Sequence, residues 1–364
     1  MLSAEELAAI WTLDDFERLA PTHMPLPALE YVAGGAGAGL TAAENRTAFN
    51  RLKINQRVMV DVSKIDTKLR LLRRDHPFPI FLAPVGYHKL VHPEGEIETV
   101  RGADLAETTF CAASFSTVLY EQIRLAARRP LWFQLYMQTD RGFTKELVQR
   151  VLSAGCEAIC VSVDVPVNGP RDRELRAGFK LPPGVERANL SGLGAAIAAG
   201  SHRPAGRNIY SATHAADVTW KDLEWLKSFI NVPLLLKGVL NPGDAMAAAD
   251  LGCDGLIISN HGGRSLDTVQ ASIDALPLIA KRVGKRVPLI LDGGIRRGID
   301  VFKALALGAT AVMIGRPYMY GLAAGGALGV SRVVEILRTE LEMTMGLAGC
   351  TKLSQISPDF LINT

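Results

Sequence analysis

The stretch Gly-Leu-Ile-Ile-Ser-Asn-His-Gly-Gly-Arg-Ser-Leu-Asp, residues 255–267, joins a short apolar run to a polar loop opened by glycines. The run predicts a buried strand, and the loop carries His261 and Arg264 three positions apart. An imidazole beside a fixed guanidinium suits proton abstraction from a small carboxylic acid, because the cation positions the anion and the base acts next to it. The alternative is an ordinary polar turn. We favour the chemical interpretation, because similar strand ends recur along the chain, as in a parallel barrel.

Apolar runs of this kind alternate with segments of helical period. Runs that are apolar throughout are typical of parallel strands, whose two faces are both covered. The eight runs are Phe78–Ala83, Thr109–Ala112, Leu131–Leu135, Ala158–Val163, Pro233–Leu236, Gly255–Ile258, Pro288–Leu291 and Ala311–Ile314. The helical segments between them include Thr144–Ala154, Pro242–Asp250 and Gly298–Leu307. The alternation predicts an α/β fold of the (β/α)8 TIM-barrel type, and a doubly wound open sheet is the alternative because it shares this alternation.

The chain is longer than a bare barrel. Its 364 residues exceed the roughly 250 residues of a typical barrel, which leaves room for an N-terminal extension and one long insertion. We therefore predict one domain over residues 1–364, with a helical cap at 1–75, the barrel at 76–345 and an enlarged loop after strand 4 at 179–222. In a barrel that loop lies over the active-site face, so we interpret it as a lid.

The glycine-rich stretch Gly34–Gly39 superficially resembles a dinucleotide-binding loop. That fingerprint follows a strand and opens a βαβ unit, with an acidic residue about 20 positions further on. Here the preceding residues, Leu29–Val32, indicate the end of a helix, and the next predicted strand is distant. The stretch therefore predicts no nicotinamide site.

Composition and charge argue against several classes of protein. The net charge is +3 and the basic residues are scattered, so no basic stripe indicates nucleic acid binding. The hydrophobic content of 48% fits a folded α/β protein. The start of the chain lacks the features of an export signal, and no run approaches the ~18 apolar residues that cross a bilayer. We expect a soluble cytoplasmic protein that binds neither nucleic acid nor a membrane.

The cysteines form an odd set without the spacing of a metal site. The five are Cys111, Cys156, Cys160, Cys253 and Cys350. An odd number with no Cys-x-x-Cys pair favours free thiols in a reducing compartment. We predict no zinc or other metal site.

Polar and glycine residues follow the predicted strands, and the carboxyl ends of barrel strands meet at one mouth, where active sites lie. In strand order these residues are Pro84, Val85 and Gly86; Ser114 and Phe115; Gln134 and Tyr136; Ser162, Asp164 and Arg171; Lys237; Ser259, His261 and Arg264; Asp292–Arg296; and Gly315 and Arg316. The last two groups are glycine-bearing and basic, which is typical of phosphate binding by backbone N–H groups and a helix N-terminus. A phosphorylated cofactor therefore fits strands 7 and 8.

Two arginines and one lysine in this set admit more than one role. Arg171 and Arg264 together suit a substrate carboxylate, whereas each alone fits a surface ion pair equally well. Lys237 closes an apolar strand, so its ammonium must reach the mouth or suffer a large desolvation cost. It either forms a Schiff base with a carbonyl or stays charged and stabilises an anionic cofactor ring. Borohydride trapping in the presence of substrate distinguishes these roles.

Three longer motifs indicate a known family. Ser259–Asp267, Leu291–Gly308 and Ile314–Pro317 match, in order and spacing, motifs of the FMN-dependent 2-hydroxy acid oxidase and dehydrogenase family. The chain resembles this family from about Tyr31 to Gly349. Glycolate oxidase, lactate oxidase, hydroxymandelate oxidase and mandelate dehydrogenase are among its members. The resemblance implies a TIM barrel that binds FMN.

The resemblance also implies roles around the substrate. His261 would be the catalytic base, Asp164 would support its protonated form, and Tyr136 would contact the 2-oxygen of the substrate. The implied carboxylate-binding residues are Tyr31, Arg171 and Arg264. The implied reaction converts an (S)-2-hydroxy acid of the lactate, glycolate or mandelate type to the 2-oxo acid, and oxygen or another acceptor reoxidises the flavin. A hydride route and a carbanion route both use His261.

For FMN, the resemblance implies binding by residues at most of the strand ends. Lys237 would lie near N1 and O2 of the flavin as a charged group, not as a Schiff base, and would stabilise negative charge there. The other implied contacts are Pro84, Val85 and Gly86 along the ring edge; Gln134 and Ser162 on the pyrimidine side; Ser259 beside Lys237; and Asp292, Gly293, Gly294, Arg296, Gly315 and Arg316 on the ribityl chain and phosphate.

Five positions depart from the family pattern. Gly86 stands where many oxidases carry alanine, as in dehydrogenase-like or monooxygenase-like members, which leaves the electron acceptor open. Ala113 replaces a serine often found near the flavin, so we take Ser114 as its substitute in cofactor binding. Phe115, Tyr87 and Asn168 replace the tryptophan, methionine and leucine of the glycolate oxidase pocket, and we assign them to substrate binding. They predict an amphipathic aromatic wall that admits lactate or an aryl acid such as mandelate, without distinguishing the two.

Two other functions stand as alternatives. An FMN-barrel isomerase without net redox predicts no flavin bleaching by hydroxy acids, and a non-catalytic ligand-binding barrel predicts binding without turnover. The presence of His261, Arg171 and Arg264 argues against both. Family members are commonly tetramers, so we expect a homotetramer, and the glycine-rich stretch Tyr320–Gly326 is suited to close helix packing.

Overall fold

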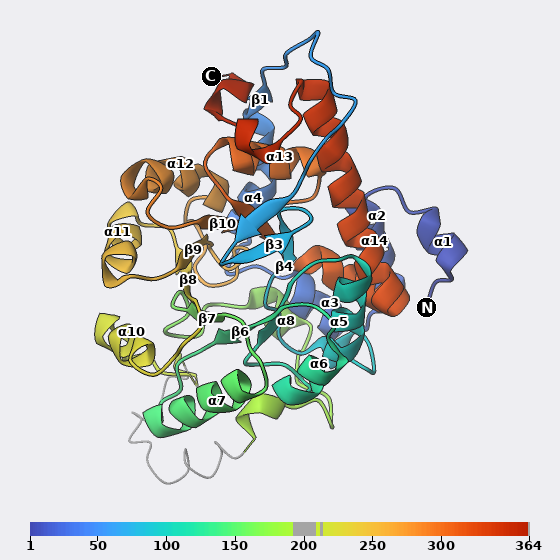
Figure 1. The fold of residues 1–364 in the computed structure, drawn as a ribbon. Coiled ribbons are helices and arrows are strands. Elements are labelled where there is room, and N and C mark those ends of the chain that lie inside the picture. Colours follow the sequence, from blue (N-terminus) through green and yellow to red (C-terminus); the bar gives the residue numbers. More distant parts are fainter. Residues whose placement is uncertain (192–208, 212–213, 363–364) are drawn as a thin grey trace.

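Eight parallel strands close into a barrel in the computed structural model, which describes residues 1–191, 209–211 and 214–362 (Figure 1). The barrel strands are β4 (Ile80–Leu82), β5 (Phe110–Ala113), β6 (Leu131–Leu135), β7 (Ile159–Ser162), β8 (Leu234–Val239), β9 (Gly255–Ile258), β10 (Leu289–Asp292) and β11 (Ala311–Ile314). Neighbours in sequence pair with one another, and β11 pairs with β4 to close the ring. The predicted TIM barrel is confirmed, and this closure excludes the open sheet.

Helices surround the strands. Those that follow the barrel strands are α5 (Glu96–Leu105), α6 (Tyr120–Ala126), α7 (Arg141–Ser153), α8 (Asp172–Arg176), α10 (Trp220–Lys227), α11 (Pro242–Leu251), α12 (Ser272–Val283), α13 (Gly298–Ala306) and α14 (Arg316–Ala348). The helices predicted around 144–154, 242–250 and 298–307 correspond to α7, α11 and α13. Helix α7 shows why such segments fold locally, because the Asp140 carboxylate caps its first amides and every third or fourth residue beyond is buried.

The barrel interior is packed with side chains and is not a pore. Phe81, Trp132 and Ile257 belong to the cluster inside the barrel, while Ile80 and Leu82, the neighbours of Phe81 in β4, belong to the outer core against the helices. Both sets are buried, because alternate residues of a barrel strand face opposite sides that are both covered. This double burial explains why the strand sequences read as continuous apolar runs.

The N-terminal extension is only partly the helical cap that the sequence predicts. Its helices are α1 (Ala4–Ala8), α2 (Leu13–His23), α3 (Leu26–Ala33) and α4 (Leu40–Arg51). Beyond them, β1 (Lys53–Ile54) pairs with the C-terminal β12 (Leu361–Ile362), and β2 (Leu69–Leu71) forms a hairpin with β3 (Arg74–His76). Leu71 of this hairpin packs into the barrel interior. The helical prediction was therefore wrong for the last third of residues 1–75.

Helix α14 contains the glycine-rich stretch that the sequence singled out. Two glycines, Gly325 and Gly326, leave the helical conformation, so α14 consists of two helical halves joined by a kink. A Cβ on Gly321 would lie 2.6 Å from the carbonyl oxygen of Gly329, so glycine allows the two halves to approach closely. By length and composition, α14 is the one helix among the described residues that meets the criteria for a membrane span, and 67% of its most apolar window is buried inside the protein.

The connection from β7 to β8 includes the enlarged loop predicted at residues 179–222. Helix α8 precedes that loop, a short 3-10 turn at Ala188–Leu190 lies within it, and α10 begins at its end. Part of the predicted lid, residues 192–208 and 212–213, lies outside the described residues. The stretch Gly34–Gly39 follows helix α3 and not a strand, which agrees with its rejection as a dinucleotide loop.

Candidate active site

A cavity of about 790 Å³ opens at the carboxyl ends of the barrel strands. All eight strands contribute lining residues from their carboxyl ends or from the loops that follow. The predicted site residues that line it are Tyr31, Pro84, Val85, Gly86, Tyr87, Phe115, Gln134, Tyr136, Ser162, Asn168, Arg171, Lys237, His261, Arg264, Asp292, Gly293, Gly294, Arg296, Gly315 and Arg316. The structure therefore brings these residues together in one cavity, and the role of each residue stays a prediction.

Two predicted cofactor contacts, Ser114 and Ser259, do not line the cavity. Ser114 Oγ donates to the Gln134 carbonyl oxygen at 2.7 Å and accepts from the Tyr136 amide at 3.1 Å. The residue before it, Ala113, lines the cavity instead. Successive residues of a strand point to opposite faces, so Ser114 lies behind the wall and braces the end of β6.

His261 and Asp164 form the acid–base pair of the site. Nδ1 of His261 lies 3.1 Å from Oδ1 and 3.2 Å from Oδ2 of Asp164, which lies behind the cavity lining. On the other side of the ring, Nε2 lies 3.4 Å from the Tyr136 hydroxyl. His261 has a left-handed backbone with φ of 60°, and its amide donates to Ser259 Oγ at 3.0 Å. The turn after β9 thus fixes the orientation of the imidazole.

The charges around this pair favour the base form of His261. Burial lowers the pKa of His261, and the positive charges of Lys237 and Arg171 act in the same direction against the opposing effect of Asp164. Burial alone would raise the pKa of Asp164, but contact with His261 and the charge of Lys237 lower it overall. A neutral imidazole beside a carboxylate anion is the state that accepts a proton from a substrate.

Arg171 and Arg264 meet in the cavity through a third residue, Glu174. Oε1 of Glu174 lies 3.2 Å from a guanidinium nitrogen of Arg171 and 3.1 Å from one of Arg264. Arg264 also donates to the carbonyl oxygens of Tyr31 and Gly34, and its guanidinium carbon lies 5.0 Å from the centre of the Tyr31 ring. These contacts join the loop after β9, helix α8 and helix α3 into one anion-binding end of the cavity.

The arginine pair is electrostatically strained. Burial and the neighbouring Arg264 lower the pKa of Arg171 to about 10, although Glu174 opposes this effect. One carboxylate shared between two guanidinium groups leaves a net positive charge. A substrate carboxylate bound here would relieve the remaining repulsion through charge-assisted hydrogen bonds.

Lys237 is held as a charged group at the centre of the site. Its Nζ lies 2.9 Å from Ser259 Oγ and 3.0 Å from Asp292 Oδ2. Burial alone would lower the pKa of Lys237, but the carboxylates of Asp292 and Asp164 raise it above the ordinary value. A Schiff-base lysine needs the opposite shift, so the geometry favours the charged role. Ser259 lies behind the cavity lining, where it links Lys237 to the catalytic loop.

Three buried polar atoms test whether a flavin fits this cavity. Gln134 Nε2, Ser162 Oγ and Asp292 Oδ1 have no hydrogen-bond partner among the described residues, and all three residues line the cavity. Buried polar groups are rarely left in this state unless a ligand or water satisfies them. One amide donor, one hydroxyl and one carboxylate acceptor match the carbonyl, N–H and hydroxyl groups of the pyrimidine ring and ribityl chain of FMN. The donor set therefore fits the predicted cofactor.

Arg316 marks the phosphate end of the cavity. Its guanidinium donates to the carbonyl oxygens of Val32, Gly34 and Gly262, at 3.0, 2.7 and 2.8 Å. Burial and the neighbouring Arg264 lower the pKa of Arg316 to about 9. A buried cation hydrogen-bonded to three backbone carbonyls is stabilised further by an anion, and Arg316 opens the long helix α14, whose N-terminus favours negative charge.

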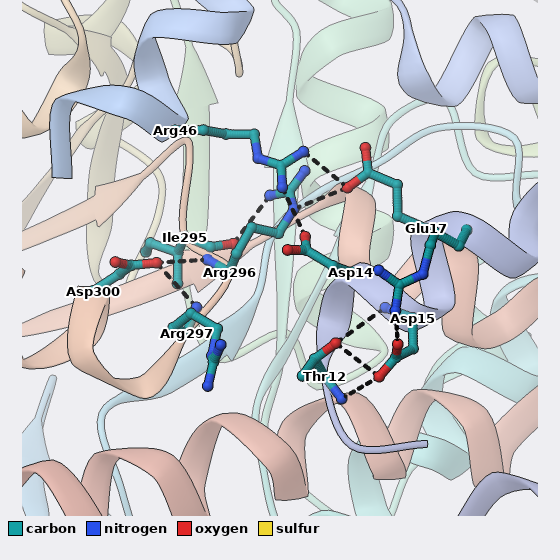
Figure 2. Close-up of polar contacts among 10 residues, drawn as sticks. Thr12, Asp14, Asp15, Glu17, Arg46, Ile295, Arg296, Arg297 and Asp300 are labelled. Atoms are coloured by element: carbon teal, nitrogen blue, oxygen red, sulfur yellow. Dashed lines mark hydrogen bonds and ion pairs between the residues drawn. The ribbon is translucent and has the colours of Figure 1, made fainter. Parts of the chain in front are cut away.

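Arg296 joins this end of the site to the N-terminal helix α2, as Figure 2 shows. Its Nε lies 3.5 Å from Oε2 of Glu17, and the same carboxylate oxygen lies 3.1 Å from Arg46. Arg46 also pairs with Asp14, the other acidic residue on this face of α2, at 2.7 Å. Arg296 lines the cavity, so a carboxylate from the N-terminal cap contacts one of the two predicted phosphate-binding arginines.

The N-terminus of α13 is not open for a phosphate. The amides of Arg296 and Arg297 donate to Asp300 Oδ2, both at 3.0 Å, and the amide of Gly298 donates to Glu340 Oε2 at 2.7 Å. These carboxylates satisfy the first free amides of the helix. The helix N-terminus predicted at this end is therefore that of α14, following Gly315.

Aromatic side chains form the wall at the substrate end. The Tyr87 ring contacts that of Tyr31 at 5.6 Å between centres, and the Phe115 ring contacts those of Tyr87 at 5.9 Å and Tyr136 at 5.0 Å. Asn168 lines the same cavity. The predicted amphipathic wall is present and extends from the arginine pair to the base.

Sequence reasoning missed several lining residues. They are Glu174, Phe179, Arg187, Ile209 and His214. Glu174 had a detectable signal, because it lies three positions after Arg171 in a helical segment. The other four come from the irregular loop between β7 and β8, where no periodicity predicts which side chains turn toward the cavity.

Fold and site together define a class of protein. It is a (β/α)8 barrel enzyme with a phosphate-binding end, a buried lysine in the middle and a carboxylate-binding end next to a histidine base. Among the residues that the structure describes, no group of three or more His, Cys, Asp and Glu side chains is arranged to hold a metal ion.

Comparisons with known proteins identify the family within this class. The family model for FMN-dependent dehydrogenases matches residues 20–363. The chain is 43% identical over 357 residues to an L-lactate oxidase of Nostoc sp., covering 96% of this chain and 97% of that protein. It is 40% identical to a glycolate oxidase of Spinacia oleracea, covering 96% and 94% of the two chains. The solved structure of a mandelate oxidase with (S)-2-phenylpropionate superimposes with a TM-score of 0.88 at 36% identity, covering 98% of this chain and 99% of that one.

The chain belongs to the FMN-dependent 2-hydroxy acid oxidase and dehydrogenase family. It is an FMN-dependent oxidoreductase, as the resemblance of its motifs implied.

Proposed function

We propose that the protein oxidises (S)-2-hydroxy acids to 2-oxo acids. The observation that carries this proposal is that His261, oriented by Asp164, lines the same cavity as Arg171 and Arg264. A 2-hydroxy acid carries its hydroxyl on the carbon next to its carboxylate. A molecule whose carboxylate is held by the two guanidinium groups can therefore place its neighbouring hydroxyl next to the imidazole.

The protein residues divide the proton chemistry among them. Nε2 of His261 accepts the proton of the 2-hydroxyl group, and the Asp164 carboxylate stabilises the imidazolium that forms. Burial raises the pKa of Tyr136, so its phenol stays protonated and can donate a hydrogen bond to the 2-oxygen. Arg171, Arg264 and Tyr31 hold the carboxylate in place.

The cofactor residues act as a fixed electrostatic frame. When bound, FMN would supply the acceptor for the hydrogen and the two electrons that leave the substrate carbon. Lys237 provides a permanent positive charge at the centre of the cavity, and Gln134, Ser162 and Asp292 offer buried polar atoms to the polar edge of the cofactor. The arginines Arg296 and Arg316 would hold the phosphate.

Oxygen or another acceptor reoxidises the flavin in the proposed cycle. Gly86, which lines the cavity, is the position that leaves the acceptor open. A Cβ at Gly86 would lie 3.0 Å from Phe115 Cβ and 3.4 Å from the Tyr31 hydroxyl. Glycine thus keeps open a part of the cavity that alanine would crowd. Readmitting oxygen to the substrate-reduced enzyme decides the acceptor: reoxidation within one turnover time supports oxygen, and much slower reoxidation supports another acceptor.

A substrate panel tests the proposed reaction. The measurements are kcat/KM with glycolate, (S)-lactate and (S)-mandelate and the identity of the 2-oxo acid product. We expect turnover with a preference for an acid larger than glycolate, because a larger substrate side chain can pack against Tyr87 and Phe115. Tight binding with no product would support the non-catalytic barrel. Product formation without net oxidation would support the isomerase.

We further propose that the enzyme is a cytoplasmic homotetramer. All five cysteines are buried free thiols, which supports a reducing compartment. Exposed apolar side chains such as Val58 and Met59, 74% and 100% exposed, support burial against another copy of the chain. Light scattering after size-exclusion chromatography should give four times the mass of the chain, and the mass of one chain would overturn the assembly.

A further inference from the structure

Arg187 adds a third guanidinium to the substrate end of the cavity. It comes from the loop between β7 and β8, and it lines the cavity together with Tyr87 and Phe115. Its Nε donates a hydrogen bond to the Tyr87 hydroxyl. Its guanidinium carbon lies 4.2 Å from the centre of the Phe115 ring and 5.8 Å from that of Tyr87. The aromatic wall thus carries a cation on the part that the substrate side chain meets.

The position of Arg187 follows from the chain of ring contacts along the wall. One end of the wall, Tyr31, touches the carboxylate-binding Arg264. The other end, Tyr136, lies beside His261. Tyr87 and Phe115 lie between these ends, and Arg187 contacts both of them. A substrate whose first carboxylate is held by Arg171 and Arg264 therefore directs its side chain along the surface that Arg187 occupies.

The carboxylates at this end lie away from Arg187. Glu174 lies between Arg171 and Arg264, and Asp164 lies beside His261. The first carboxylate of a substrate binds at the Arg171 and Arg264 end. A second carboxylate that reaches Arg187 would bind through charge-assisted hydrogen bonds to a planar guanidinium.

We propose that Arg187 binds a second carboxylate at the far end of the substrate side chain, so that the enzyme prefers (S)-2-hydroxy dicarboxylic acids of about the size of malate or 2-hydroxyglutarate. This inference rests on the proposed oxidation of 2-hydroxy acids and names its substrate class. An apolar wall distinguishes substrates by only ~1–3 kcal/mol per methylene, whereas a guanidinium in the wall favours an anion over a neutral group of the same shape. Arg187 is then a specificity-determining residue.

Matched substrates isolate the effect of the second charge. (S)-Malate is compared with (S)-2-hydroxy-4-methylpentanoate, in which an isopropyl group replaces the second carboxylate. The readout is the ratio of their kcat/KM values, with (S)-lactate as a third substrate. The wild-type ratio should favour malate by about tenfold or more, the effect of one charge-assisted hydrogen bond.

Variants assign that preference to Arg187. Arg187→Met should lower the ratio at least tenfold, Arg187→Lys should keep part of it, and Tyr87→Phe should lower it partially because the guanidinium loses its hydrogen-bonded anchor. Arg176→Met is the matched control, since Arg176 is 77% exposed on α8 and should leave the ratio unchanged. Oxaloacetate titrated into the oxidised holoenzyme should bind more weakly to Arg187→Met, read from the flavin spectrum. If Arg187→Met does not retain FMN, Arg187→Lys and Tyr87→Phe carry the test.

The outcomes separate this inference from the proposed function. Turnover of lactate with no preference for malate over its neutral counterpart overturns the inference and leaves the proposed function standing. An equal loss of both activities in Arg187→Met also overturns it. Absence of flavin reduction by every hydroxy acid overturns the proposed function and the inference together.

Discussion

Nδ1 of His261 lies 3.1 Å from Oδ1 of Asp164, and this contact sets the chemistry of the site. A carboxylate anion at this distance accepts the Nδ1 proton, so the lone pair of the neutral ring is on Nε2. Nε2 is the atom that lies beside the Tyr136 hydroxyl. The contact therefore selects the tautomer that can act as a base toward a bound substrate.

The pH dependence of substrate oxidation should follow His261. Burial lowers the pKa of His261 below its ordinary value of 6.5, and the active form is the neutral one. We expect kcat/KM to be independent of pH near neutrality and to fall about tenfold per pH unit only below that lowered pKa. Steady-state rates between pH 4.5 and 8 measure this profile. An acidic limb with its midpoint above 6.5 would contradict the assignment.

Asp164→Asn should damage catalysis without emptying the cofactor site. The amide cannot stabilise the imidazolium and permits the wrong tautomer, so kcat/KM should fall by about 10²–10⁴-fold. Because the Asp164 charge raises the pKa of His261, the acidic limb of the remaining activity should move to lower pH. Asp217→Asn, at a carboxylate that is 80% exposed, is the control. Wild-type kcat/KM, or a limb shifted upward, would refute this role.

Lys237→Met should destabilise the protein. The Nζ of Lys237 lies 3.0 Å from Asp292 Oδ2, and both side chains are buried. Removing one partner of a buried ion pair leaves an uncompensated charge, which costs about 3–5 kcal/mol. Thermal unfolding of the single variant and of Lys237→Met with Asp292→Asn measures the effect, and the double variant should recover part of the loss. A single variant as stable as the wild type would show that the pair contributes nothing.

We expect Glu17, which lies outside the cavity, to weaken FMN binding in the wild type. Its carboxylate contacts Arg296 at 3.5 Å and would lie near the cofactor phosphate, so Glu17→Gln should tighten the Kd for FMN several-fold, most strongly at low salt. Flavin fluorescence quenching measures the Kd of the apoprotein. Asp14→Asn is the control, because Asp14 pairs with the same Arg46, whereas Arg296 pairs with Glu17. Equal shifts in both variants, or weaker binding in Glu17→Gln, would oppose this account.

The barrel and its mouth were predictable from sequence for a physical reason. Strands buried on both faces leave continuous apolar runs, and the parallel arrangement gathers the residues after each run at one end. His261, Arg264 and Lys237 could be placed in one cavity by this rule alone. The family resemblance then supplied roles that the pattern could not.

The misses have equally specific causes. The β2–β3 hairpin turns at Leu72 and Arg73, which adopt φ of 48° and 67° without the glycine or asparagine that usually marks such a turn. Ser114 was predicted as a cofactor contact because the sequence shows where the strand ends but not which side chains face the cavity. A shift of one residue along a strand moves a side chain to the opposite face. Arg187 comes from a loop without periodicity, so its approach to Tyr87 and Phe115 appears only in three dimensions.

The most direct measurement is anaerobic mixing of the FMN-loaded enzyme with an (S)-2-hydroxy acid while the flavin absorption is followed, with His261→Gln as the paired variant. The account predicts rapid bleaching in the wild type. In His261→Gln it predicts normal FMN content with bleaching slowed by about 10²–10⁴-fold, because the base is lost and the cofactor contacts remain. Bleaching of His261→Gln at the wild-type rate, or no bleaching of the wild type by any acid in the panel, would contradict it.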